Sequence, residues 1–346
     1  MEKMRFVPRG LVCCLILAWA GLILMWMSVP ADAQTKESPI VLKVSHDLPG
    51  TSRGTKVVMA SKFKELVESR SQGRLVVQIH PGGELYNDPE GLVATSKGTI
   101  FSQVVSSDAL TPWEPGIEVF SMYGLFDGRD HCARFLAHKE GGREIFSRLE
   151  KKRLVVRLYV SGPWLLWTKT QVTTLEDLKG MPIRTSLSKM EASCIQALGC
   201  TTFPLAVGEL FTAAQTGMIK GTVTLPLSVG SRKLEEVFRF CVVEPPFEIN
   251  YAGMAVSKTI LDKMNPDLKK TVMDSLEEAA DHTSTQGVKV NDDYVTDLKK
   301  KGVTFVKLSP SEWAKFKSRF KEVHNKFVAE NPKALEGLMK AVDATR

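Results

Sequence analysis

Hydrophobic and polar positions follow two different periods in the region that begins at residue 40. Short apolar runs predict strands at Ile40–Ser45, Arg74–His80 and Thr99–Val105. Apolar residues at helical spacing predict helices between them, at Thr55–Ser69 and Asp88–Ser96. Strands that alternate with helices over short connections are typical of a parallel sheet covered by helices.

The same pattern starts again after residue 150. Strands are predicted at Leu154–Val160 and Met181–Thr185. A helix is predicted to begin at the capping-box sequence Ser188-Lys-Met-Glu191 and to end at Gly199, and another to cover Ala206–Thr216. The chain is therefore expected to form two α/β units of similar size.

The last part of the chain is predicted to be mainly helical. Residues 257–301 are helix-like for much longer than average, with a break expected near Gln286-Gly287. An element of this length is long enough to run across both units. A second capping box, Ser309-Pro-Ser-Glu312, predicts the start of a terminal helix with Pro310 in its first turn.

The N-terminal segment has the pattern of a secretory signal peptide. Basic residues precede an apolar run, Leu11–Met27, which is followed by Ala31-Asp-Ala33. Cleavage is predicted before Gln34, which makes residues 1–33 the signal peptide and the mature protein an exported one. The alternative is a retained membrane anchor, because the run reaches the roughly 17 residues that a spanning helix needs.

Composition and charge restrict the class of protein. The chain has 346 residues, of which 43% are hydrophobic and 25% charged, and a formal net charge of +7. These values exclude a disordered chain, a collagen-like repeat and a multi-span membrane protein, and the length leaves room for two domains. The positive charge is spread along the chain, so it suits small anionic ligands at least as well as nucleic acid. No nucleic acid partner is expected.

Four cysteines lie outside the predicted signal peptide: Cys132, Cys194, Cys200 and Cys241. An oxidising compartment would allow one or two disulfides among them, but free, buried thiols are the expected state of most. The sequence contains no C-x-x-C, which disfavours structural zinc and a thioredoxin-type centre.

No catalytic or metal-binding motif stands out. The sequence lacks G-x-S-x-G, H-E-x-x-H, a P-loop and G-x-G-x-x-G, and its histidines are scattered. Glu84, Asp88 and Glu90 form an acidic cluster that fits a calcium site, but acids at a helix start explain it more economically. We therefore expect no metal, no cofactor and no enzyme, although missing motifs do not exclude one.

One segment carries chemical information. The sequence Leu175-Glu-Asp-Leu-Lys-Gly-Met-Pro-Ile-Arg184 predicts a turn that leads into a strand with Arg184 at its carboxyl end. Ligands of open α/β sheets bind beyond the carboxyl ends of strands, close to the start of the following helix. A guanidinium there can hold a carboxylate with two parallel hydrogen bonds. The alternative is a structural arginine in a salt bridge within the protein.

Four blocks of sequence, in order, carry a resemblance to a known family. They are Ser71-Gln-Gly-Arg-Leu-Val-Val-Gln-Ile-His-Pro-Gly-Gly-Glu-Leu85, the helix-to-strand segment Gly91–Gly98, Leu175–Arg184, and Pro204–Ala214 followed by Gln215-Thr-Gly217. Together they resemble the solute-binding proteins of tripartite ATP-independent periplasmic (TRAP) transporters, the DctP-like family. The resemblance covers most of the mature chain.

The resemblance implies a two-lobed periplasmic binding protein fold, in which α/β lobes close on a ligand like a hinged trap and a long helix crosses both. It implies a first lobe of residues 34–161 plus about 251–290, and a second of 162–250 plus about 291–346. It also implies that Arg184 forms a salt bridge with the carboxylate of an organic acid. The protein would be a periplasmic monomer that delivers this acid to the membrane permease subunits of a TRAP transporter.

Departures from the family pattern affect the expected ligand. Thr224 takes the place of a frequent ligand-facing Asn, and Val207 that of an aromatic residue. Lys220 replaces an acid, and whether the departures at residues 218–224 alter transport stays open. Trp164 stands where some acid-sugar binders carry a second Arg, although an aromatic residue at a strand end can equally belong to the core. With Arg184 as the one retained carboxylate-binding arginine in a more apolar pocket, a monocarboxylate is favoured over a dicarboxylate.

Polar residues at strand ends of the first lobe complete the set of candidates. His46 and Asp47 follow the first strand, and Ser106 follows the third. For Ser106 an ordinary turn is an equally good explanation. Two other functions remain possible on these residues: a binding protein of an ATP-driven or sensor-linked system, and an exported α/β enzyme using His46 or Glu84.

Overall fold

The computed structural model describes residues 38–186, 188–205 and 209–346. Every element described below lies within Ile40–Arg346. The predicted signal peptide and Val207 lie outside the described residues. Within the described ranges, no helix combines the length and the apolar character that a membrane crossing requires.

The first three strands form a parallel sheet, as predicted. Strand β1 (Ile40–Ser45) lies between β2 (Leu75–His80) and β3 (Ser102–Ser106), and pairs with both in parallel. The connecting helices are α2 (Thr55–Arg70) and α3 (Asp88–Lys97). All five predicted elements of this region are confirmed, with bounds that differ by at most three residues.

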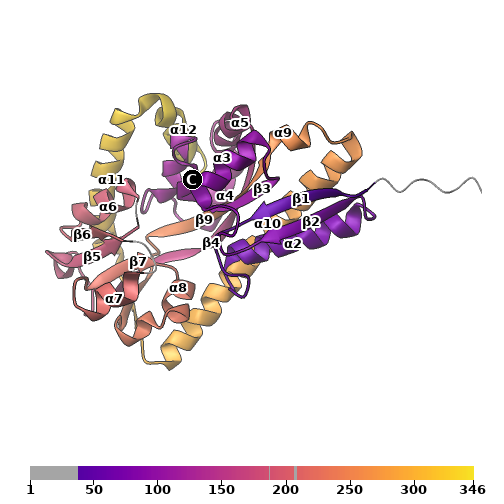
Figure 1. Cartoon of the computed structure of the whole chain (residues 1–346). Helices are drawn as coiled ribbons and strands as arrows, with labels where there is room; N and C mark the ends of the chain where they lie inside the picture. Colours follow the sequence, from indigo (N-terminus) through magenta and orange to yellow (C-terminus); the bar gives the residue numbers. More distant parts are fainter. Residues whose placement is uncertain (1–37, 187, 206–208) are drawn as a thin grey trace, which may run out of the picture. The chain divides into compact units, whose positions relative to one another are not determined.

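A long strand joins this sheet to the next group of strands (Figure 1). Strand β4 (Leu154–Thr168) is more than twice as long as the predicted strand, and its first part pairs antiparallel with β9 (Glu248–Ser257) up to the pair Trp164 and Glu248. Strand β9 also pairs with β3. The last residues of β4 pair instead with β7 (Gly221–Thr224), where Leu165 faces Thr224. The predicted lobe boundary at residue 161 thus falls within β4, and the lobe boundaries stay a prediction.

The second group of strands continues from β7. Strand β5 (Pro182–Thr185) pairs in parallel with β7 on one side and with β6 (Thr201–Pro204) on the other. Helices α6 (Lys189–Ala197) and α7 (Leu210–Gln215) follow β5 and β6. Two further strands, β8 (Phe240–Glu244) and β10 (Thr304–Lys307), pair with each other, and β8 also pairs with β4.

The predicted break of the long helix at residues 286–287 is wrong. Helix α10 (Pro266–Lys300) is continuous through Gly287, and the interruption lies earlier, between α9 (Lys258–Leu261) and Asn265, which caps α10. Gly287 serves close packing instead, because a Cβ at this position would lie 2.6 Å from the backbone oxygen of Val160 in β4. The glycine thus lets the helix approach the strand without ending the helix.

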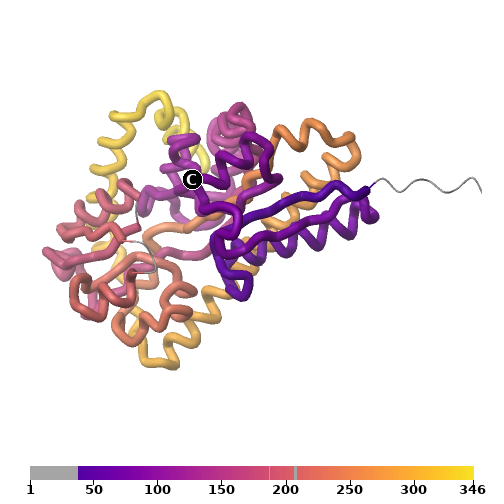
Figure 2. The backbone as a smooth tube through the Cα atoms, viewed as in Figure 1, coloured from indigo at the N-terminus to yellow at the C-terminus, as the bar shows by residue number. Residues whose placement is uncertain are grey.

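The terminal helix begins where predicted. Ser309 Oγ accepts a hydrogen bond from the backbone N–H of Glu312 at the start of α11 (Pro310–Glu330), and one more helix, α12 (Pro332–Ala344), follows. Figure 2 shows these C-terminal helices beside segments from the middle of the chain, and their apolar residues share one core. Three shorter helices lie before and after β4: α4 (Arg129–Ala137), α5 (Gly142–Lys151) and α8 (Pro226–Ser231).

The cysteines are free and buried, as expected. Cys132, Cys194, Cys200 and Cys241 form no disulfide. Burial raises the pKa of the thiols, to about 12 for Cys132, Cys194 and Cys200. They therefore act as small apolar core residues rather than as reactive thiolates.

Candidate functional site

The carboxyl ends of two neighbouring strands carry the candidate residues of the predicted second lobe. Strands β5 and β7 run in parallel, with Arg184 opposite Thr222, so both strands end at the same edge of the sheet. Thr224 ends β7, and its neighbour on β4 is Leu165, the residue after Trp164. Three predicted site residues, Arg184, Thr224 and Trp164, thus lie on adjacent strands.

The Arg184 side chain is buried and oriented by the backbone. It is 5% exposed, and its Nε and Nη2 atoms both donate to the carbonyl oxygen of Leu205, at 2.9 and 2.6 Å. These bonds use one edge of the planar guanidinium. The Nη1–Nη2 edge, which can hold a carboxylate with two parallel hydrogen bonds, makes none with the described residues.

The alternative of a structural salt bridge is not supported at Arg184. No acidic oxygen of the described residues lies within 4 Å of its guanidinium, since none of their ion pairs includes it. Burial lowers the pKa of Arg184, and the negative charge of Glu191 opposes this shift. A buried cation without a close counterion is costly, and an anionic ligand would offset that cost.

Glu191 is the acid that most affects Arg184. It is 1% exposed, and its Oε2 accepts a hydrogen bond from the backbone N–H of Ser186 at 2.9 Å. Its own N–H donates to Ser188 Oγ at 3.2 Å, which confirms the predicted helix start. Burial raises the pKa of Glu191 to about 7, although Ser186 and Arg184 lower it. Its charge near Arg184 therefore changes around neutral pH.

Trp164 and Thr224 both make contacts within the protein. Trp164 is half-buried and packs against a core cluster, which is the alternative stated for it above. Thr224 is 4% exposed, and its backbone oxygen accepts a hydrogen bond from Trp167 Nε1 at 3.0 Å. Ligand contact by either side chain stays a prediction, as it does for Val207.

The candidates of the first lobe surround a buried lysine that sequence reasoning missed. Lys56 Nζ donates to Asp47 Oδ1 at 2.8 Å and to Asp88 Oδ2 at 2.7 Å, and Asp88 Oδ2 also accepts from the backbone N–H of Ser106 at 3.0 Å. Although burial opposes it, Asp88 and Asp47 raise the pKa of Lys56. Asp47, Lys56, Asp88 and Ser106 therefore form one network, and Asp47 and Asp88 already neutralise the lysine.

His46 is buried beside this network. It is 1% exposed, its Nδ1 has no partner among the described residues, and burial lowers its pKa. A neutral imidazole there can exchange hydrogen bonds with a ligand or water. Asp88 begins α3, where Asn87 Oδ1 caps the N–H of Glu90, so the acids at 88 and 90 lie at a helix start as expected. No group of residues suited to a metal ion occurs in the described part of the chain.

Glu248 lies within electrostatic reach of both groups of candidates. Burial, followed by the charge of Glu191, raises its pKa well above the usual range, and Asp108 and Glu118 add to the shift. Asp108 lies two residues after Ser106. The charges of Glu191 and Asp108 thus both act on the Glu248 carboxyl.

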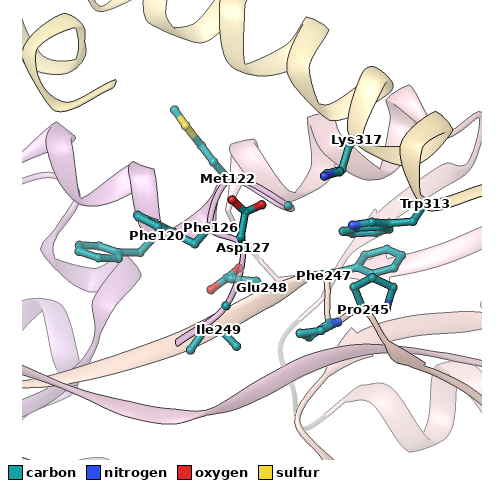
Figure 3. A pocket seen from close by; sticks show the side chains of 13 residues that line it. Phe120, Met122, Phe126, Asp127, Pro245, Phe247, Glu248, Ile249, Trp313 and Lys317 are labelled. Atoms are coloured by element: carbon teal, nitrogen blue, oxygen red, sulfur yellow. The ribbon is translucent and has the colours of Figure 1, made fainter. Parts of the chain in front are cut away.

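A cavity of about 170 Å³ adjoins Glu248 (Figure 3). Glu248 lines it together with Trp313 and Lys317 of α11, and Phe247 lies next to Trp313, with ring centroids 5.9 Å apart. The cavity is smaller than the roughly 300 Å³ at which small-molecule sites begin, and Arg184 does not line it. We therefore place the candidate site at Arg184 and not in this cavity.

Comparison with known proteins gives the family. The model of the bacterial extracellular solute-binding protein family 7, DctP, matches residues 46–331. The chain belongs to this family. A family 7 relative from Rhodobacter capsulatus, the C4-dicarboxylate-binding periplasmic protein DctP, is 28% identical over 304 residues, which are 86% of this chain and 88% of the relative. The 2,3-diketo-L-gulonate-binding periplasmic protein YiaO of Escherichia coli is 25% identical, over 83% of this chain and 87% of the relative.

Solved structures of TRAP periplasmic solute-binding proteins share the fold. One from Ochrobactrum anthropi superposes with a TM-score of 0.82 at 24% identity, and covers 90% of this chain and 97% of its own. One from Shewanella oneidensis, with bound succinate, has a TM-score of 0.78 at 23% identity over 89% and 99% of the two chains. The two-lobed α/β fold predicted for this DctP-like protein is therefore confirmed.

Proposed function

We propose that this family 7 protein captures an organic acid between its two lobes, with the acid's carboxylate on the Arg184 guanidinium. The single observation that carries the proposal is the state of Arg184. This buried cation has two donors fixed on Leu205 O, a terminal edge without a partner among the described residues, and no counterion within 4 Å among them. The relatives named for C4-dicarboxylate and 2,3-diketo-L-gulonate support an acid as the ligand.

The delivery step follows from the family. We propose that the loaded protein passes the acid to the membrane permease subunits of a TRAP transporter and acts as a monomer. Export through the predicted signal peptide would place it in the periplasm, as the names of its relatives also suggest. N-terminal sequencing of the exported protein should then find Gln34 as the first residue.

An enzymatic function has less support. His46 is buried, and Glu84 is exposed apart from its 3.8 Å approach to His80. Neither forms a nucleophile–base pair in the described structure, and solute binding without turnover is the activity of the family. The ATP-driven alternative is disfavoured because the matching solved structures are TRAP proteins.

The sequence also bears on whether the ligand carries one carboxylate or two. On the motif positions alone the ligand would be a monocarboxylate, since Trp164 replaces a second Arg and leaves one clamp. Only the cations at motif positions enter this count.

A thermal-shift screen of organic acids tests the proposal directly. A ligand at about 100 times its dissociation constant stabilises a protein by about 2.7 kcal/mol, which raises the unfolding temperature measurably. We expect at least one carboxylate to stabilise the wild type and to have no such effect on Arg184→Gln. Arg319→Gln, which removes an exposed arginine on α11, is the matched control and should respond like the wild type. Equal stabilisation of Arg184→Gln would contradict the proposal.

A further inference from the structure

A second, larger cavity lies between the two C-terminal helices. Helix α11 ends at Glu330, and Asn331 alone connects it to α12 (Figure 1). The groove between these helices has a volume of about 770 Å³, which is within the range of small-molecule sites. Neither Arg184 nor any other described candidate residue lines it. The groove is therefore separate from the site proposed at Arg184.

The groove is held open because its two helices pack on different elements. A Cβ on Gly116, in the 3₁₀ helix Pro115–Ser121, would lie 2.7 Å from the Leu338 side chain of α12, whereas α11 packs against α6. The end of α12 is fixed on α4, since Arg134 Nε donates to Thr345 O at 2.7 Å. The helices cannot close on each other without breaking these contacts, so the groove is a built-in feature of the fold.

Each helix contributes one row of side chains to the groove. Those of α11 include Lys317, Lys321, His324 and Val328, and those of α12 include Glu336, Met339 and Asp343. Spacings of three or four residues place each row on one face of its helix. Leu125 completes the lining from the segment before α4. The groove thus combines apolar side chains with charged ones.

The charges of the lining favour an anion. Neither Lys317 nor Lys321 belongs to an ion pair of the described residues. Among the other charged side chains, Asp343 pairs with Arg346, and Glu336 has no ion pair in the described part of the chain. Two lysines less one glutamate leave one positive charge without a partner, which an anionic ligand would neutralise.

His324 gives a second, independent indication of a ligand. It lines the groove and is only 5% exposed, and its Nε2 makes no hydrogen bond with the described residues. Burial lowers its pKa to about 4, so the imidazole is neutral at neutral pH and adds no charge to the lining. A buried nitrogen without a partner is costly, and a polar ligand group beside it would reduce that cost.

We infer that the groove between α11 and α12 is a second binding site, and that its ligand is an amphipathic anion with one carboxylate at the end of an apolar chain. The carboxylate would lie at Lys317 and Lys321, which are one helical turn apart. The chain would cover Leu125, Val328 and Met339. The inference does not depend on the acid proposed for Arg184, because that residue does not line the groove.

Calorimetric titration of the mature chain with butyrate, hexanoate, octanoate and decanoate tests this inference. We expect the affinity to rise by about two- to fourfold for each added CH₂, because each one buries apolar surface. Decyltrimethylammonium, which has the same chain length as decanoate but the opposite charge, should bind at least tenfold more weakly than decanoate. The double substitution Lys317→Gln/Lys321→Gln should lower the affinity for decanoate about tenfold.

Lys326→Gln is the matched control, because Lys326 is an exposed lysine of the same helix that does not line the groove. It should bind decanoate like the wild type, and so should Arg184→Gln. The inference is overturned if the wild type does not bind decanoate, if its affinity does not increase with chain length, or if decyltrimethylammonium binds equally well. It is also overturned if the double lysine variant keeps the wild-type affinity, if Lys326→Gln loses as much, or if Arg184→Gln abolishes binding, which would place decanoate at Arg184.

Discussion

At the residue scale, the candidate site is defined by buried charged side chains. Arg184 is buried with a backbone oxygen as its partner, and Glu191, which the helix start holds close by, has a pKa of about 7. As the pH rises, Glu191 loses its proton and its negative charge weakens the positive potential at Arg184. As the pH falls, protonation of Glu191 strengthens that potential. The anion affinity of the site should therefore depend on the proton occupancy of Glu191.

We predict that carboxylate affinity rises by roughly three- to tenfold as the pH falls from about 8 to about 6, because protonation removes a negative charge beside Arg184. Titration calorimetry over this range, with a ligand that stays ionised, measures the effect. Glu191→Gln keeps the acceptor for Ser186 but cannot ionise, so its affinity should be nearly independent of pH. An equally steep pH dependence in Glu191→Gln would rule out this role.

Glu191 also affects stability. Its pKa is raised from 4.5 in the unfolded chain to about 7 in the fold. The stability that comes from favouring the protonated form is fully present below about pH 4.5 and is lost as the pH rises through about 7. Relative to the wild type, Glu191→Gln should thus be more stable at pH 8, by a few kcal/mol at most, and similar at pH 4.5. Urea denaturation at the two pH values measures this difference, and equal effects at both would contradict it.

At the element scale, helix α10 packs closely on strand β4. Gly287 lets the helix approach Val160, and Asn291 one turn later binds Ser161 O. The sequence predicted the length of this helix but placed a break at Gly287, because local propensity cannot distinguish a glycine that ends a helix from one that permits a tertiary contact. The strands β8 and β9 were missed since their pairing partners are far away in the chain.

Gly287→Ala should destabilise the protein by about 1–3 kcal/mol, because the new methyl group would meet the Val160 oxygen. Gly337→Ala is the matched control: Gly337 lies in α12 with nothing within 4 Å of an added Cβ, so helix propensity should make this change neutral or stabilising by up to about 1 kcal/mol. Urea denaturation measures both changes. Equal effects of the two substitutions would contradict the packing role of Gly287.

At the scale of the whole molecule, the sequence was most informative where local signals coincide. The first parallel sheet, both serine-capped helix starts and the position of Arg184 at a strand end could be predicted from periodicity and short motifs. The Lys56 network and the Leu205 contact of Arg184 could not, since each depends on segments that meet only in the fold.

A binding protein of this fold is expected to close on its ligand. Strand β4 changes partner from β9 to β7 after Trp164, and such a crossing point can bend while the two groups of strands stay intact. We predict that a saturating ligand reduces the radius of gyration measured by small-angle X-ray scattering. An unchanged radius in the wild type at saturation would contradict closure.

The central claim is that the Arg184 guanidinium holds the carboxylate of the ligand. Its most direct test is the dissociation constant of the tightest acid from the screen, measured by calorimetry for the wild type, Arg184→Gln and Arg184→Lys. Loss of one partner of a buried charge pair costs about 3–5 kcal/mol, so Arg184→Gln should bind at least a hundredfold more weakly, and Arg184→Lys should recover only part of the loss. Wild-type affinity in a folded Arg184→Gln protein would contradict the claim.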